Sequence, residues 1–205
     1  QTLLLKQELR RNVEPDEKVV EYVEKCGRKA ENLFKSDDDA VFEKVYDINL
    51  DEIKPVVARP HQIDDVVDAK EVKDVKIDEA FLDHVNNGRI EELRVAAEIL
   101  KGKKVSEQRK IFDAPASNEV YMQALDEGLI DIFMESGAMV MNCNCSVCWG
   151  KLSGCHRGKD EVLISTGTRN FKGRAGHPDS YVYLGSAATV TASAIEGKIT
   201  TADQI

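Results

Sequence analysis

The 205-residue sequence has no apolar run that approaches the roughly 20 residues needed to span a bilayer. Residues 1–11 also lack the order of a signal peptide, in which a cationic stretch precedes an apolar stretch and small residues. Basic residues are fewer than acidic ones, 28 against 37, which gives a formal net charge of −9. A surface of that sign is poorly suited to neutralising many phosphates, so we expect neither a nucleic-acid nor a membrane partner. Together with the lack of a spanning segment and of a signal-peptide pattern, this predicts a cytoplasmic protein.

Internal repeats and low-complexity tracts are also missing from the sequence. Hydrophobic residues make up 42% of the chain, which is enough for the core of one sizeable domain. Cysteine is scarce: of five in the chain, one is the isolated Cys26 and the other four crowd into residues 143–155. In a reducing compartment such a cluster indicates metal or redox chemistry rather than disulfides.

Residues 1–54 are predicted to be a connecting segment at the end of an upstream domain. Pro15 and Asp16 favour the start of a helix that continues to Glu24, because proline and an acidic residue suit a first helical turn. An acidic turn follows at residues 36–39, and alternating apolar residues predict extended structure over 41–50. The chain starts with Gln, and we expect it to be part of a longer polypeptide.

From residue 55 onward, short apolar runs alternate with amphipathic helices that stop at glycines. Strands are predicted at residues 56–58, 77–82, 104–114 and 161–166, and helices at 90–100, 117–127, 130–136 and 186–196. This succession predicts a three-layer α/β/α domain over residues 55–205, with a mainly parallel sheet because helical crossovers favour parallel strands. Sites in such domains usually lie on long loops, here residues 143–160 and 167–180.

Thiols are concentrated in the first of these loops, at Cys143, Cys145 and Cys148, with Cys155 and His156 after them. Cys145 and Cys148 stand three residues apart and can converge on one metal centre. Thiolates are soft ligands that suit zinc or an iron–sulfur cluster. Spacing alone leaves three interpretations open: a cluster, a closed tetrahedral zinc site, or a set of buried free thiols.

The second loop carries two arginines, Arg169 and Arg174, around Gly173 and directly after a predicted strand. Guanidinium groups bind carboxylates through paired hydrogen bonds, so such a loop can clamp a small di- or tricarboxylate. A solvent-exposed basic loop is the alternative that charge alone favours. The sequence NNGR at 86–89 is a further turn signal, between a strand and a helix, where amides can meet an anion.

Several motifs resemble those of the large subunits of the aconitase superfamily. They are RNFKGR at 169–174, YLGS at 183–186 and AIEGKIT at 194–200. CSVCWG at 145–150 falls where that family has its paired cluster cysteines, and NGRIEELR at 87–94 resembles the segment after its first cluster cysteine. The resemblance runs from about residue 16 to the end and favours the branch of 3-isopropylmalate dehydratases and homoaconitases.

This resemblance implies the carboxy-terminal part of a hydro-lyase large subunit, corresponding to the family's third α/β/α domain. Such enzymes interconvert 2- and 3-isopropylmalate in leucine biosynthesis, or act on homoaconitate and homocitrate, by dehydration and rehydration. By the same resemblance, Cys145 and Cys148 are paired ligands of a 4Fe-4S cluster, and Arg169 and Arg174 hold substrate carboxylates. A small swivel-domain subunit is implied as the partner that supplies the base.

Several positions depart from the family's pattern, among them Asn144, Ser146 and Val147, which replace the glycines and proline that usually shape the cysteine loop. Val85 stands where the family has its first cluster cysteine, and a valine side chain cannot ligate iron, which leaves Cys143 as the nearest replacement. Thr168 stands where an asparagine usually precedes the first arginine. These departures support a second hypothesis, a non-catalytic or engineered homologue that keeps the fold and has a structural metal, or none, in the loop 143–155.

Overall fold

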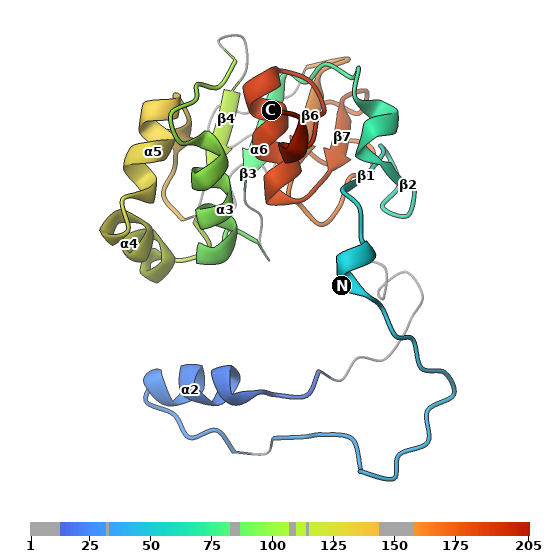
Figure 1. Ribbon diagram of the computed structural model, residues 1–205, viewed down its shortest axis with the longest axis vertical. Helices are drawn as coiled ribbons and strands as arrows, with labels where there is room; N and C mark the ends of the chain where they lie inside the picture. Colours follow the sequence, from blue (N-terminus) through green and yellow to red (C-terminus); the bar gives the residue numbers. More distant parts are fainter. Residues whose placement is uncertain (1–12, 32, 83–86, 107–109, 114, 144–157) are drawn as a thin grey trace. The chain divides into compact units, whose positions relative to one another are not determined.

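The computed structural model describes residues 13–31, 33–82, 87–106, 110–113, 115–143 and 158–205 (Figure 1). The chain divides into two compact units, Gln1–Ile53 and Lys54–Ile205. No helix among the described residues combines the length and the apolar character needed to cross a membrane.

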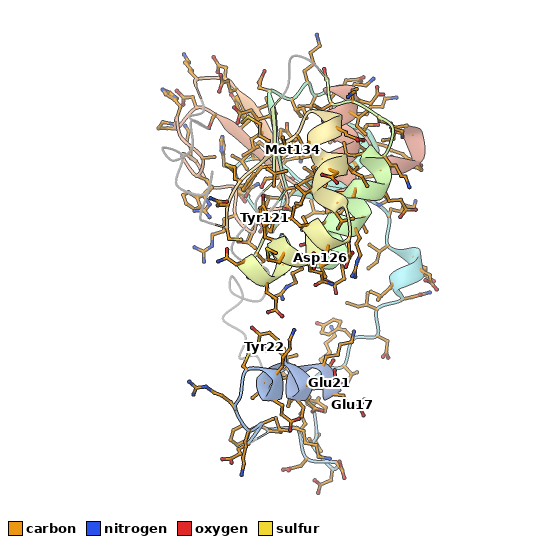
Figure 2. The ribbon with its side chains drawn as sticks, turned by 90° about the vertical axis from the view of Figure 1, so that its left-hand side faces the viewer. Glu17, Glu21, Tyr22, Tyr121, Asp126 and Met134 are labelled. Atoms are coloured by element: carbon orange, nitrogen blue, oxygen red, sulfur yellow. The ribbon has the colours of Figure 1, made fainter. Side chains whose placement is uncertain are left out.

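The first unit contains helix α2 (Glu17–Lys25) and the short 3₁₀ helix η1 (Leu50–Glu52). Helix α2 confirms the predicted helix, and its start is set by Asp16, whose carboxylate accepts a hydrogen bond from the Val19 amide at 3.0 Å. None of its residues is buried, and Glu17, Glu21 and Tyr22 project from it in Figure 2.

The strand-like pattern at residues 41–50 does not form a strand. Its apolar side chains are exposed, with 96% of Val41, 69% of Val45 and 71% of Ile48 accessible to solvent. The described residues 33–49 contain no strand at all. A strand needs a neighbour for its backbone hydrogen bonds, and alternation along the sequence cannot supply one.

The second unit is built on a sheet that has seven strands among the described residues. They are β1 (Val56–Ala58), β2 (Val66–Asp68), β3 (Glu79–Leu82), β4 (Lys110–Asp113), β5 (Met139–Val140), β6 (Val162–Ser165) and β7 (Tyr181–Leu184). Their order is β2-β1-β7-β6-β3-β4-β5. The five strands from β7 to β5 are mutually parallel, and β1 and β2 add an antiparallel edge.

The helices pack on one face of this sheet. They are α3 (Ile90–Leu100), α4 (Asn118–Asp126), α5 (Leu129–Ser136) and α6 (Ala187–Glu196), and all of them contribute to the main core. Figure 1 shows α6 lying over β3 and β6, and α3 between α6 and α5. Tyr121 and Met134 project from α4 and α5 in Figure 2. On the sheet side, Ala80, Leu82 and Ile164 pack into the same core.

The opposite face carries a smaller core in which Phe81, Leu163 and Val182 pack against Ala175. Successive strand residues point to opposite faces, so Phe81 lies on the other side of β3 from Ala80 and Leu82. Ala175 belongs to the segment that connects β6 to β7, and this connection therefore lies over the second face. Helices, sheet and connection form successive layers, and the predicted α/β class with a mainly parallel sheet is confirmed.

Some strands differ from the sequence-based expectation. The strand predicted over residues 104–114 is shorter, since β4 spans only Lys110–Asp113. Before it, the Val105 and Ser106 amides donate instead to carbonyls of α5 and α6, Ser136 and Ala194. Strands β2, β5 and β7 were not predicted; β2 and β5 have only three and two residues and lie at the edges of the sheet.

Candidate functional site

The sheet reverses its winding between β3 and β6. From β3 the chain moves through β4 to β5 by way of helices on one face, whereas from β6 it moves in the opposite direction to β7 by a segment on the other face. In open parallel sheets, ligands bind at the carboxyl ends of the strands on either side of such a switch. The topology therefore points to the ends of β3 and β6 as the site.

A small hollow, with room for about one water molecule, lies at that position. It is lined by residues from the ends of both strands and from the starts of α3 and α6: Leu82, Gly88, Glu92, Leu93, Thr166 and Ala187. The Asn87 side-chain amide donates a hydrogen bond to the Thr166 carbonyl, which ties the segment after β3 to the end of β6. Gly88 adopts a positive φ of 73°, a conformation that glycine accepts without steric cost as the chain turns into α3.

Directly beyond Thr166 begins the arginine loop, which we define as residues 167–176. Its burial alternates, because the Arg169 side chain is exposed, Asn170 is completely buried, and half of Phe171 is exposed. The predicted carboxylate-binding residue Arg169 thus lies next to a side chain that is fixed inside the protein.

The second predicted arginine, Arg174, is partly buried and packs against the loop itself. Its amide donates to the Phe171 carbonyl at 3.0 Å, and its guanidinium carbon lies 5.6 Å from the centre of the Phe171 ring. Gly173, with a φ of 80°, makes this tight turn possible. Phe171, which accepts this hydrogen bond, directly follows Asn170. The turn therefore connects the backbone of Arg174 to that of Asn170.

The exit from the loop is braced by a second turn before β7. The Ser180 hydroxyl donates to the His177 carbonyl at 2.8 Å, and the Asp179 amide donates to Nδ1 of His177 at 3.0 Å. Lys172 Nζ lies 3.6 Å from a carboxylate oxygen of Asp179. Both charged groups are well exposed, so this ion pair contributes little stability.

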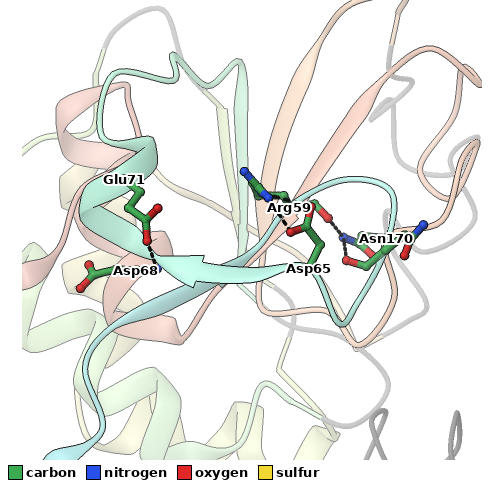
Figure 3. Close-up of polar contacts among 6 residues, drawn as sticks. Arg59, Asp65, Asp68, Glu71 and Asn170 are labelled. Atoms are coloured by element: carbon green, nitrogen blue, oxygen red, sulfur yellow. Dashed lines mark hydrogen bonds and ion pairs between the residues drawn. The ribbon is translucent and has the colours of Figure 1, made fainter.

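On its buried side the arginine loop contacts the turn that follows β1. Nδ2 of Asn170 donates to the carbonyl oxygens of Arg59 at 2.7 Å and Gln62 at 3.2 Å (Figure 3). Arg59 also binds Asp65 through two side-chain hydrogen bonds, 3.0 Å from Nε to Oδ2 and 2.6 Å from Nη2 to Oδ1. These bonds raise the pKa of Arg59.

The same turn is connected to β7. The rings of His61 and Tyr181 are stacked, with their centres 5.6 Å apart. Tyr183, two residues further along β7, is half-buried, and this burial raises the pKa of its hydroxyl group. The sequence did not identify Asn170, Arg59 and His61 as parts of the site. The contacts between them and between His61 and Tyr181 join residues more than 100 positions apart, which only the folded chain brings together.

The thiols are placed only in part. Cys143 is partly exposed and lies just after β5, at the edge of the sheet that is far from the arginine loop. Three strand spacings of about 4.8 Å separate β5 from β6, or roughly 14 Å. Cys145, Cys148 and Val85 lie outside the described residues. Arg169 and Arg174 lie together in the loop that follows β6.

The described residues also contain no group of three or more His, Cys, Asp or Glu side chains arranged to hold a metal ion.

Comparison with known proteins gives the family. The model of the aconitase family (aconitate hydratase) matches residues 10–197. The chain belongs to the aconitase family. It is 47% identical over 188 residues to the probable 3-isopropylmalate dehydratase large subunit of Methanothermobacter thermautotrophicus, which covers 92% of this chain and 45% of that relative.

Two further relatives have corresponding names. The 3-isopropylmalate dehydratase large subunit of Hydrogenobaculum sp. is 45% identical over 193 residues, covering 94% of this chain and 45% of the relative. That of Aquifex aeolicus is 42% identical over 198 residues, covering 94% and 46%. The chain thus spans a little less than half the length of these relatives, and the resemblance predicted from its motifs is confirmed.

Proposed function

We propose that this chain is the carboxylate-binding, carboxy-terminal part of the large subunit of a hydro-lyase that interconverts 2- and 3-isopropylmalate in leucine biosynthesis. The observation that carries the proposal is the arginine loop. It leaves β6 at the topological switch, and it presents Arg169 and Arg174 from a backbone held by the buried Asn170. Membership of the aconitase family and the names of the relatives support the same reaction class.

The reaction removes water from a hydroxy acid and adds it back with the hydroxyl on the neighbouring carbon. A base takes the proton from the carbon next to a carboxylate, a double bond forms, and the hydroxyl on the adjacent carbon leaves as water. Negative charge develops on the carboxylate while the carbon–hydrogen bond breaks. Guanidinium groups that pair with this carboxylate stabilise the charge and fix the orientation of the substrate. We assign this role to Arg169 and Arg174.

The domain from residue 55 to 205 would carry the substrate loop, and the base would come from a small swivel-domain subunit. The relatives are named as large subunits, which supports a second polypeptide in the assembly. The same arginines fit homoaconitate or homocitrate equally well, because these acids share the carboxylates that the loop recognises.

The donor set of this chain does not fit the iron–sulfur cluster that the family implies. A cubane with one open iron needs three cysteine ligands; Cys145 and Cys148 supply two, and position 85 is a valine without a donor atom. Position 85 comes three residues after the end of β3 in the sequence, whereas Cys143 comes three residues after the end of β5, an edge strand of the sheet. Cys143 therefore cannot stand in for position 85 without a different arrangement of ligands.

The departures at Val85 and Thr168 favour a second function, that of a non-catalytic homologue that keeps the fold. It would retain a partner surface, with a structural metal or none in the loop 143–155.

Co-expression of the full-length large subunit with a small subunit from the same organism decides between the two. The expected result is a stable complex that dehydrates isopropylmalate, either as it stands or as the Val85→Cys variant after anaerobic reconstitution. Formation of the unsaturated acid is measured by its ultraviolet absorbance. A folded complex without turnover, both as it stands and with Val85→Cys after anaerobic reconstitution, would establish the non-catalytic function instead.

A further inference from the structure

The buried amide of Asn170 has its orientation determined by its neighbours. The side chain is 0% exposed, and both partners within hydrogen-bond distance are backbone carbonyl oxygens, those of Arg59 and Gln62. The NH₂ group must face them, because the opposite orientation would place Oδ1 against two other acceptors. One side chain therefore bridges two segments that are about a hundred residues apart in the sequence.

The turn that receives this amide is itself anchored at several points. The Arg59 amide donates to the Asp65 carbonyl at 2.8 Å, and the paired Arg59–Asp65 side-chain bonds close the turn across the same residues. At its far end, the ring of His61 stacks on Tyr181 of β7. The Asn170 amide thus binds a support that is fixed to the sheet edge.

Asn170 stands next to Arg169 and next to the residue against which Arg174 packs. Its burial directs the neighbouring Arg169 side chain outward, and Phe171, on its other side, carries the turn against which Arg174 packs. If Nδ2 released the two carbonyls, the polypeptide on either side would lose the contact that a completely buried side chain makes with the turn at residues 59–62.

We propose that Asn170 is a positioning residue, a latch that holds the arginine loop on the turn at residues 59–62 and so sets the carboxylate-binding geometry of Arg169 and Arg174. The identity of the ligand in this inference rests on the proposed function, but the role of Asn170 in holding the loop on the turn does not. Bidentate pairing tolerates little displacement, so loosening the loop should weaken carboxylate binding even with both arginines present.

The test compares Asn170→Asp with Asn118→Asp in the full-length large subunit assembled with its small subunit. Both substitutions make the same change of charge, but Asn118 is exposed at the first residue of α4. An ionised aspartate at 170 cannot donate to the two carbonyls. We expect KM for the hydroxy acid to rise at least about tenfold with a smaller change in kcat, and Asn118→Asp to match the wild type.

A pH profile separates positioning from general damage to the fold. A carboxylate that faces two carbonyl oxygens in a buried place favours its protonated form, which can donate to one of them. The KM of Asn170→Asp should therefore fall toward that of the wild type as the pH is lowered, relative to the Asn118→Asp control. A KM that equals the wild-type value at all pH values would overturn the proposal.

Hydrogen exchange keeps the latch testable even if the assembly turns out to be inactive. Asn170→Asp should speed exchange of the amides in residues 167–176 and 59–62, and leave α3 and α6 as protected as in the wild type. Unchanged exchange in the two segments would overturn the latch whatever the activity. Faster exchange in an assembly that lacks turnover would support the latch and count against the proposed function alone.

Discussion

Arg169 and Arg174 serve the same proposed ligand from different surroundings. The first has an exposed side chain next to the buried Asn170, and the second is partly buried above the Phe171 ring. A planar guanidinium makes two parallel hydrogen bonds to a carboxylate, which an ammonium group cannot reproduce. The identity of the cation should therefore matter more at these positions than at Lys172, which lies in the same loop and pairs with Asp179.

We expect Arg169→Lys to lower kcat/KM of the assembled enzyme at least tenfold, or about 1.4 kcal/mol, because the bidentate contact is lost while the charge is kept. Steady-state kinetics on the full-length assembly measure this effect. Lys172→Arg is the matched control and should change kcat/KM little. If Arg169→Lys has the kinetics of the wild type, Arg169 does not bind the substrate carboxylate.

Position 85 leads to a second prediction at the scale of single residues. The chain as written should contain iron well below cluster stoichiometry after anaerobic reconstitution, since two thiolates do not hold a cubane with one open iron. Val85→Cys should raise iron and sulfide content, measured chemically and by absorbance near about 400 nm. A full complement of iron and sulfide in the unmodified chain would contradict this and indicate Cys143 as the third ligand.

At the scale of elements, helices α3 and α4 are joined across their surface by Arg94 and Glu127. Glu127 follows the last residue of α4 and accepts hydrogen bonds from Nε of Arg94 at 2.7 Å and from Nη2 at 2.6 Å. The bonds from Arg94 lower the pKa of Glu127, because they favour the ionised carboxylate. Helix α3 lines the pocket at the switch point, so this pair also supports the site.

The pH dependence of this pair follows from the direction of the shift. A carboxylate whose pKa is lower in the folded state stabilises the protein above the unfolded-state pKa, and the stabilisation is lost as the pH falls through the folded-state value. Glu127→Gln should therefore lower the midpoint of thermal unfolding slightly at neutral pH, and the difference from the wild type should vanish in acid. Glu135→Gln, an exposed substitution on α5, is the control. A difference that persists at low pH would assign the effect to something other than the ion pair.

At the scale of the whole molecule, the two units differ in how they are held together. The second has a continuous core on both faces of its sheet, whereas the described part of the first has no buried residue in α2 and no strand. Residues 33–49 are almost entirely exposed and contain neither helix nor strand.

Limited digestion of the 205-residue chain with trypsin should therefore begin after Lys35 or Lys44, because proteases cut where the backbone opens at little cost. Mass spectrometry of the early fragments identifies the sites. The prediction is that the first unit is cleaved before the second. It would be contradicted by an early cut after Lys101 at the end of α3, or after Lys198 behind α6, while the segment 33–49 is still intact.

The sequence by itself determined the helices of the second unit and the positions of its candidate site residues along the chain. Apolar periodicity and glycine stops placed α3, α5 and α6 almost to the residue, because helical contacts join residues three or four apart. Motifs identified the family, and valine at position 85 is a fact of the sequence alone.

Only the tertiary structure decided the rest. The strand order that puts β3 beside β6, the antiparallel pairing of β1 with β7, and the contact of Asn170 with the turn at 59–62 all join residues far apart in the sequence. No local pattern encodes such contacts, since an asparagine in a loop looks the same whether its amide meets water or two buried carbonyls. The failed strand at 41–50 illustrates the same limit, because alternation predicts a strand only where another strand is present to pair with it.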